Sequence, residues 1–249
     1  MKVILLTTRI YAPGVIRLCN ALKSTGISIE EIVCARNPIE NKYKHLAANN
    51  LLMRQAKSRI KSSNSNQIYD NSLTNLKACD IRLRFFIEAF HSQKVVEYLS
   101  NIFPDILVHV NGPIFRQPTI ETARLGLINS HMGLLPEFRG MNVAEWSVLH
   151  GYPTGNTIHF INTGIDTGNI LQFFQVPVND CSTVKEMRDK LISLQYEQTA
   201  KVIKMLQEKK LSPIPQLPTQ GRQYFRMHPE LKAKVEQILS QGYQPKVIV

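Results

Sequence analysis

Residues 128–140 read INSHMGLLPEFRG. An apolar run that is typical of a buried strand ends here in an amide and an imidazole, Asn129 and His131, before the chain turns away. Side chains alternate between the two faces of a strand, so these two residues point the same way. The stretch therefore predicts a strand whose end presents two polar groups toward one point, and we take it as the first candidate site.

The regions around this stretch predict an α/β fold. Apolar strands that alternate with amphipathic helices favour a Rossmann-like, mainly parallel sheet with helices on both faces. In such sheets ligands collect at the carboxyl ends of the strands, which is where Asn111 and the Asn129/His131 pair are expected. The predicted strands are 2–7, 29–35, 106–110, 127–129, 157–161 and 170–177, and the predicted helices are 15–24, 95–101, 119–125, 141–150, 184–209 and 230–239.

The composition favours a soluble, cytoplasmic protein. With 249 residues, 43% of them hydrophobic, the chain suffices for one large domain or for one domain with a small appendage. No stretch reaches the roughly 18 unbroken apolar residues of a membrane span, and the first residues lack the apolar core of a signal peptide. The four cysteines have neither CxxC nor Cys/His spacing, which argues against a disulfide framework and a zinc site.

The charge distribution suggests a domain organisation. The formal net charge is +11, yet the central region 85–200 is net acidic, so the basic residues gather on both sides of it. We expect a main domain over 1–210, in which 37–85 is a basic insertion or mobile segment, and a short C-terminal extension over 211–249. The basic flanks suit an anionic substrate, a phosphate or a nucleic acid, or they form an ordinary solvated surface.

Taken one at a time, the polar residues have plain structural interpretations. A single histidine beside an apolar run is usually hydrogen-bonded in the core, and Asn129 can cap the turn that follows. Asp166, in the glycine-bracketed sequence NTGIDTGN at 162–169, is equally typical of a turn former. The sequence contains no GxGxxG, GxxxxGK[ST], GxSxG or HExxH motif, and its seven histidines lack metal-ligand spacing.

Considered together, Asn129, His131 and Asp166 indicate acyl transfer. Asp166 follows the predicted strand 157–161, from which its carboxylate could reach an imidazole. The amide and the imidazole can stabilise an oxyanion, and the carboxylate can orient the imidazole and hold it protonated. A serine or cysteine nucleophile is unnecessary if the substrate brings its own, for example an amine.

Three ordered motifs resemble a known family. The segment NSHMGLLP at 129–136, with Arg-Gly at 139–140, is similar to the pattern Asn-x-His-x-Ser-Leu-Leu-Pro followed by Arg-Gly in the folate-dependent formyltransferases. The likeness includes 112–115 upstream and 165–171 downstream, and it extends over about 104–178. This family includes glycinamide ribonucleotide, methionyl-tRNA and sugar N-formyltransferases.

The resemblance implies the formyltransferase fold, 10-formyltetrahydrofolate as formyl donor and no metal. Asn129, His131 and Asp166 match the family's catalytic residues. A neutral amine would attack the formyl carbon, Asn129 and protonated His131 would stabilise the oxyanion, and Asp166 would maintain the imidazolium and assist proton removal. The implied folate-binding residues are Asn111, Gly112, Ile114, Phe115, Leu134, Asn162, Gly164 and Ile165.

The acceptor is less constrained. We expect a small amine that carries negative charge, such as a nucleotide-linked amino sugar, because the basic segments would attract its phosphates. An amino-acid, peptide or guanidine acceptor remains an alternative, and so does a non-enzymatic basic binding module that kept the fold. The candidate substrate contacts are Arg9, Arg82, Arg84, Arg139, Arg222 and Arg226.

No nucleic-acid or membrane partner is expected. The basic segments lack the regular aromatic interleaving of single-strand binders. The apolar end of the chain, Val247 to Val249, suggests a docking contact such as a homodimer.

Two departures from the family pattern narrow these expectations. Gly133 stands where the family usually has serine. The loop at 7–14 lacks the small residues that cradle a ribose phosphate in the glycinamide ribonucleotide enzymes, which weakens that alternative. We expect no separate C-terminal barrel of the methionyl-tRNA type, whereas Gly221 to Tyr224 resembles the Gly-x-x-Tyr closing element of several small family members.

Overall fold

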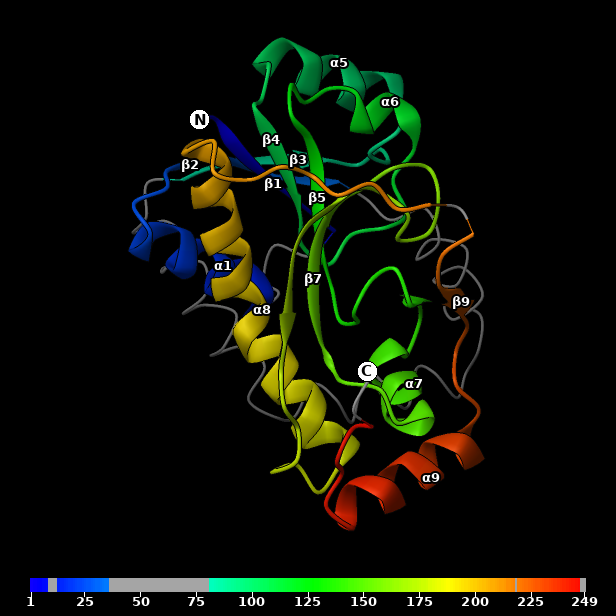
Figure 1. Ribbon diagram of the computed structural model, residues 1–249. Helices are drawn as coiled ribbons and strands as arrows, with labels where there is room; N and C mark the ends of the chain where they lie inside the picture. Colours follow the sequence, from blue (N-terminus) through cyan, green and yellow to red (C-terminus); the bar gives the residue numbers. More distant parts are fainter. Residues whose placement is uncertain (9–12, 36–80, 218, 247–249) are drawn as a thin grey trace, which may run out of the picture. The chain divides into compact units, whose positions relative to one another are not determined.

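The computed structural model describes residues 1–8, 13–35, 81–217 and 219–246 (Figure 1). The chain divides into two compact units. The first comprises Lys2–Asn20 and Ser28–Leu125, and the second comprises Met1, Ala21–Ile27 and Gly126–Val249.

Several predictions fall outside the described residues. They concern Arg9, the apolar end at 247–249 and residues 37–80 of the basic segment. The remainder of that segment, 81–85, lies in and just before a strand.

The first unit contains a parallel sheet with the strand order β3-β2-β1-β4. Every residue of β1 is buried, as expected for an inner strand of a parallel sheet. The strands are β1 (Val3–Thr7), β2 (Ile29–Ala35), β3 (Arg82–Phe86) and β4 (Ile106–His109), and the helices are α1 (Pro13–Ser24), which continues into the second unit, α5 (Gln93–Ile102) and α6 (Gln117–Ile120).

The predicted helix over 119–125 is wrong in extent, because α6 is a single turn that ends at Ile120. The Thr119 hydroxyl donates to the carbonyl of Phe90 at 2.9 Å, and the Thr122 hydroxyl donates to the carbonyl of Thr119 at 2.8 Å. The local bond of Thr122 competes with the helical ladder, which is consistent with the early end of this helix, whereas the bond of Thr119 ties the turn to Phe90.

In the second unit, three strands pair in the order β5-β7-β8, and both pairs are antiparallel. A separate pair of short parallel strands, β6 and β9, stands beside them in the same unit. The strands are β5 (Gly126–His131), β6 (Phe138–Gly140), β7 (Gly155–Phe160), β8 (Ile170–Gln175) and β9 (Arg222–Tyr224), and the helices are α7 (Val143–His150), α8 (Val184–Gln207) and α9 (Pro229–Ser240).

The α/β, Rossmann-like class is confirmed, and the antiparallel β5-β7-β8 group is what the sequence pattern did not predict. Residues 161–169 join β7 to β8, and this connection is too short for the crossover that parallel neighbours require. The tail at 211–229, predicted to be irregular, contains β9.

One long helix covers one face of the antiparallel strands. α8 packs along β5, β7 and β8 (Figure 1). It begins with a capping box in which the Thr183 side chain and the Glu186 side chain each bind the other's backbone amide. The opposite face of β5 and β7 is left for the loops that carry the candidate site.

The C-terminal segment is packed onto the rest of the second unit. β9 pairs with β6, and α9 packs on α7 around a core that includes Ala144, Val148 and Val235. The boundary expected at 210/211 stays a prediction. Whatever that boundary, residues after 211 contribute to the surroundings of the candidate site.

Candidate functional site

The end of β5 and the middle of β7 together form a polar cluster. Asn129 and His131 share one face of β5, and Ser130 between them points to the other. In the antiparallel register His159 lies directly opposite Asn129, and Thr157 lies opposite His131. Opposed residues point to the same face of a sheet, so the four side chains gather on the face away from α8.

His159 is a site residue that the sequence did not predict. Its Nε2 lies 3.3 Å from Nδ2 of Asn129, and its Nδ1 lies 2.8 Å from the carbonyl oxygen of Phe160. The side chain is 2% exposed. Alternation along the strand places His159 on the same face as Thr157, but only the pairing register brings it to Asn129, and a single sequence does not contain that register.

Asp166 bridges the two imidazoles. Its Oδ2 lies 3.4 Å from Nδ1 of His131, and its Oδ1 lies 3.5 Å from Nε2 of His159. The loop between β7 and β8 folds back over the face of these strands and brings the carboxylate there. Asn129, His131 and Asp166 are thus brought together as predicted, although on a face of antiparallel strands rather than at a shared carboxyl edge.

The short strand β6 contacts both His131 and Asp166 through its backbone. The carbonyl oxygen of Phe138 lies 2.7 Å from Nε2 of His131, and the amide of Gly140 donates to Oδ2 of Asp166 at 2.9 Å. Both ring nitrogens of His131 therefore face an acceptor. This arrangement fixes the plane of the imidazole and suits a ring that carries a proton on each nitrogen.

Two glycines allow β9 to approach β6 closely. A Cβ on Gly140, whose φ is +99°, would lie 2.2 Å from the carbonyl oxygen of Tyr224. A Cβ on Gly221, at φ +67°, would lie 1.6 Å from the carbonyl oxygen of Pro136. Neither position tolerates a side chain. The Arg-Gly and Gly-x-x-Tyr motifs thus meet in space and hold β6 in place beside His131 and Asp166.

The surroundings of Asp166 favour its ionised form. Burial alone would raise its pKa, but the contact with His159, the charges of His131 and His159 and the Gly140 amide outweigh burial and lower the pKa to about 2. Asp166 is therefore a carboxylate throughout the physiological pH range.

For the pKa of His131, burial outweighs the effect of the neighbouring groups. Its burial lowers the pKa, and the nearby His159 acts in the same direction. The charge of Asp166 and the hydrogen bond to Phe138 raise the pKa again, but only in part. The net effect is a pKa below the ordinary value for histidine, and the ring faces two acceptors that would stabilise an added proton. That Asp166 holds the ring protonated stays a prediction.

Comparison with known proteins identifies the family. A family model described as formyl transferase matches residues 36–203, which is more than half of the chain. The chain belongs to the formyl transferase family.

The curated relatives in this family match the chain over only part of their own length. The methionyl-tRNA formyltransferase of Clostridium tetani (strain Massachusetts / E88) is 31% identical over 142 residues, which are 54% of this chain and 46% of that protein. The chain therefore spans about half the length of the curated relatives it matches.

Solved structures share the fold of the formyl transferase family. Glycinamide ribonucleotide transformylase 1 from Symbiobacterium toebii is similar with a TM-score of 0.60 and 16% identity, over 90% of this chain and 92% of that chain. An N-formyltransferase from Helicobacter canadensis, solved with folinic acid and dTDP-3-aminofucose, is similar with a TM-score of 0.57 and 14% identity, over 100% of this chain and 84% of that chain.

Gly133, the departure from the formyl transferase pattern, lies against the imidazole. A Cβ at this position would lie 3.0 Å from Nε2 of His131, 3.0 Å from the carbonyl oxygen of Phe138 and 2.9 Å from Cγ2 of Val143. A serine would therefore push against the hydrogen bond between His131 and Phe138. Glycine permits the close contact of the loop with the ring in this chain.

Three of the predicted folate-binding residues of the second unit lie in the loop of Asp166, and the fourth, Leu134, lies near Gly155 at the start of β7. The Asn162 side chain accepts from the Gly164 amide at 3.1 Å and from the Thr167 hydroxyl at 2.7 Å, and so shapes the turn that leads to Asp166. Ile165 precedes the carboxylate directly, and the partly buried Leu134 follows the His131 strand. Their contact with a folate stays a prediction.

The remaining predicted folate-binding residues belong to the first unit. Asn111 has a positive φ of 52°, and the amide of Gly112 donates to the ring of His109 at 2.6 Å. Ile114 is 72% exposed, whereas Phe115 is buried against Phe90 and His109. Ile114 therefore has a side chain available to a ligand, and Phe115 has one that serves the core of its own unit.

The predicted arginines differ in their partners. Arg82 pairs with Glu30 at 2.5 Å, and Arg84 donates to the Tyr98 hydroxyl at 2.9 Å, both within the first unit. Arg139 lies on β6 between the two residues that contact His131 and Asp166, and its Nε is buried without a partner among the described residues. Arg222 and Arg226 are exposed on and just after β9.

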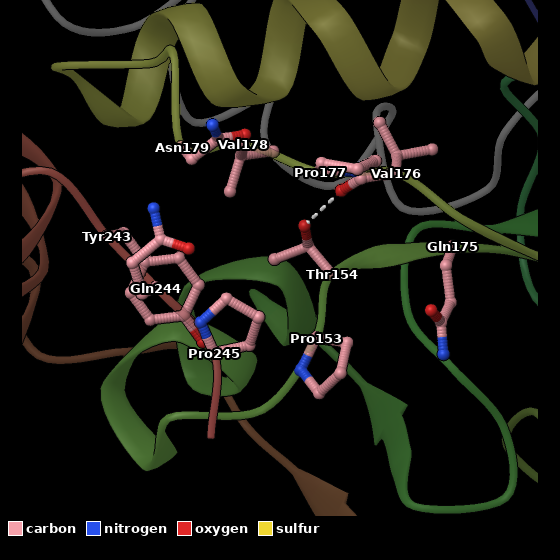
Figure 2. Close-up of a pocket in the computed structure, with 10 residues that line it drawn as sticks. All are labelled: Pro153, Thr154, Gln175, Val176, Pro177, Val178, Asn179, Tyr243, Gln244 and Pro245. Carbon is pink, nitrogen blue, oxygen red and sulfur yellow. Dashed lines mark hydrogen bonds between the residues drawn. The ribbon is translucent and has the colours of Figure 1, made fainter. Parts of the chain in front are cut away.

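A pocket of about 250 Å³ lies in the second unit, away from these residues (Figure 2). It is formed at the start of β7, after the end of β8 and along the chain near Tyr243, whereas Asp166 lies in the loop that joins the other ends of β7 and β8. In the wall of the pocket, the Thr154 hydroxyl donates a hydrogen bond to the carbonyl of Val176 at 2.6 Å. The pocket includes none of the predicted site residues.

No helix in the described part of the chain is long and apolar enough to cross a membrane. Among the same residues, no group of three His, Cys, Asp or Glu side chains is arranged to hold a metal ion.

Proposed function

We propose that the protein is an N-formyltransferase that moves a formyl group from 10-formyltetrahydrofolate to the amine of a small, anionic acceptor. The observation that carries the proposal is the bridging of His131 and His159 by Asp166, with Asn129 on the same face. Membership of the formyl transferase family supports the same reaction. The donor would supply an activated formyl carbon.

Each residue has a role that follows from its surroundings. Asn129 donates an amide N–H to the oxygen that becomes negative when an amine adds to the formyl carbon. His131 takes a proton from the attacking nitrogen, since burial lowers the pKa of its ring and two acceptors can stabilise the protonated form. Asp166, ionised because its pKa is about 2, stabilises the imidazolium. His131 then returns the proton to the departing nitrogen.

The loop before Asp166 fits the formyl donor. Asn162, Thr163 and Gly164 are exposed beside the partly buried carboxylate of Asp166, and the Asn162 side chain is already used within the turn. Such a turn offers backbone groups rather than charged side chains to a ligand. Folinic acid, the reduced folate bound by the similar Helicobacter canadensis protein, is a suitable probe for this site.

Two features of β6 and β9 support an anionic, nucleotide-linked acceptor. The guanidinium of Arg139 has a buried Nε without a partner among the described residues and lies on the strand that contacts His131 and Asp166. Tyr224 lies with its ring 5.2 Å from those of both Phe138 and Trp146. Arg222 is close enough to Tyr224 to lower that phenol's pKa, against the larger effect of burial. A cation beside aromatic rings suits a phosphate attached to a base.

The amino-acid, peptide and guanidine acceptors, the basic binding module, the homodimer and the cytoplasmic location stay predictions. The match to methionyl-tRNA formyltransferases favours inclusion of an aminoacyl acceptor in any test. Because the chain matches only about half of the length of those relatives, we do not infer that it uses the same acceptor.

The test is a mass-spectrometric screen of amine acceptors with purified protein and 10-formyltetrahydrofolate. The panel contains nucleotide-linked amino sugars such as dTDP-3-aminofucose, free amino acids, arginine and methionyl-tRNA. We expect one class to gain the mass of a carbonyl group, and we expect the Asp166→Ala protein to give no product. Absence of product with every acceptor, together with no saturable binding of folinic acid, would refute the proposal. Nucleic-acid binding that falls steeply with added salt would instead favour the binding module.

A further inference from the structure

The C-terminal segment reaches the loop that carries Asp166. Ile214 and Ile170 exchange two backbone hydrogen bonds, each 2.8 Å long. Two residues further on, the side-chain amide of Gln216 donates to the carbonyl oxygen of Asp166 at 3.1 Å and to that of Gly168 at 2.5 Å. A single side chain thus ties together the backbone on both sides of Thr167.

The assignment of the Gln216 amide is fixed by its neighbours. Both groups that it faces are carbonyl oxygens, which accept and cannot donate, so Nε2 and not Oε1 must point to them. The Oε1 atom is buried and has no partner among the described residues. Burial of this oxygen costs hydration. Among the described residues, the two hydrogen bonds of Nε2 to the loop are what offsets that cost.

The backbone of Asp166 needs such support. Its φ is +53°, in the left-handed region, which aspartate tolerates better than most residues but which is still less common than the right-handed region. A left-handed residue in a loop persists when the surrounding contacts determine its conformation. Relaxation of φ would rotate the side chain, and with it the carboxylate that lies 3.4 Å from His131.

We propose that Gln216 is a positioning residue for Asp166: its two hydrogen bonds hold the loop in the conformation that brings the carboxylate to His131. The expected effect of Gln216 on turnover rests on the proposed function. Its effect on the position of the Asp166 carboxylate does not depend on that function. Gln216 belongs to a segment that the sequence predicts to be irregular, and it acts through Asp166 without contact with the reacting groups.

The test compares Gln216→Met and Gln216→Ala with Gln223→Met, a control on the exposed β9 strand of the same C-terminal segment. Methionine keeps the length of the side chain but removes both donors. Ile214 is 53% exposed and Leu217 is 57% exposed, so the segment around Gln216 lies at the surface, and we expect all three variants to fold.

The first measurement is the pKa of His131, obtained by NMR titration of the labelled imidazole in the whole protein without ligand. The charge of Asp166 raises this pKa, so a displaced carboxylate lowers it. We expect a lower pKa in both Gln216 variants and the wild-type value in Gln223→Met. An unchanged pKa in folded Gln216 variants overturns the proposal. Unfolding of both also overturns it, since the residue would then be required for folding instead.

The second measurement is formyl transfer with the acceptor found in the screen. We expect kcat to fall about 10- to 100-fold in Gln216→Met with little change in KM, because a misplaced catalytic group slows the chemical step. Equal loss in Gln223→Met would contradict the inference. If no acceptor is found, the His131 titration still decides the role of Gln216, so failure of the proposed function and failure of this inference remain distinct.

Discussion

The two faces of the β5-β7 pair both bury polar side chains, yet they differ in chemistry. On the face toward α8, the Asn156 amide donates to the carbonyl of Leu191 at 2.9 Å and to Oε1 of Gln198 at 2.8 Å. On the other face, Asn129 contacts His159, and His131 and His159 each lie close to Asp166.

The partners explain the difference. On the α8 face they are amides and a backbone carbonyl of a long helix, so the polar groups are neutral and held by regular structure. On the site face they are titratable groups, and the key partner comes from a loop with a left-handed residue. Burial of polar groups alone therefore does not mark a site. Mutual contact of titratable groups on irregular backbone does.

The strongest test of this comparison removes a group from each face of β5. We expect His131→Ala and Asp166→Ala to lose formyl transfer by about 10³-fold or more, because the proton acceptor or its counter-charge is missing. Ser130→Ala, on the α8 face, should keep turnover within a few-fold, and circular dichroism should show all three proteins folded. Near-normal turnover in either site-face variant would remove the basis for the assignment.

A second test uses the two asparagines. Asn129→Ala should lower kcat by about 10²- to 10³-fold with a small effect on stability, as expected for loss of one oxyanion donor. Asn156→Ala should instead reduce the free energy of unfolding by about 1–3 kcal/mol, since it leaves buried partners unpaired, and should keep kcat within a few-fold. Kinetics and urea unfolding of both proteins separate the two effects, and identical behaviour would show that the faces do not differ in role.

The site could be predicted from the sequence as far as its chemistry is local. Asn129 and His131 are two apart on a strand and Asp166 lies in a glycine-bracketed turn, so residue type and spacing suffice to select them. The alternation of strands and helices likewise suffices for the fold class. The antiparallel register of β5 and β7, which adds His159, depends on pairing between distant segments and is not visible in one sequence.

The resemblance of Gly221 to Tyr224 to a closing element could be seen in the sequence, but the contacts of the C-terminal segment could not be predicted, for the same reason. Gly221 fits against the carbonyl of Pro136, and Gln216 donates to the Asp166 loop, but both contacts join residues about 50 or more positions apart. Gly133 could be recognised as a departure from the family pattern. Its contact with the His131 ring became clear only from the geometry.

A third test restores the family's serine on the site face. Gly133→Ser places a Cβ 3.0 Å from both His131 Nε2 and the Phe138 carbonyl, so one of them must shift. We expect a loss of about 1–3 kcal/mol in the free energy of unfolding from overpacking and a loss of about tenfold in kcat from the moved imidazole. Gly26→Ser is a comparison that adds backbone strain without crowding, because Gly26 has a φ of +73° and nothing lies within 4 Å of its Cβ position. If Gly133→Ser is as stable and active as the wild type, the loop adapts freely and the contact with His131 carries no role.

The smallest expected effect concerns the pH dependence and tests whether His159 acts on His131 by charge. In His159→Gln an amide donor remains available to Asp166, but the charge that lowers the pKa of His131 is gone. The pKa of His131 should therefore rise. Because the neutral ring takes up the proton, turnover falls as the pH drops through this pKa, and the acid limb of kcat should move to higher pH. The Ser130→Ala protein is the control, since it changes the opposite face of β5 without changing charge. An acid limb that stays in place, or moves to lower pH, would mean that His159 influences His131 through the position of Asp166 and not through its own charge.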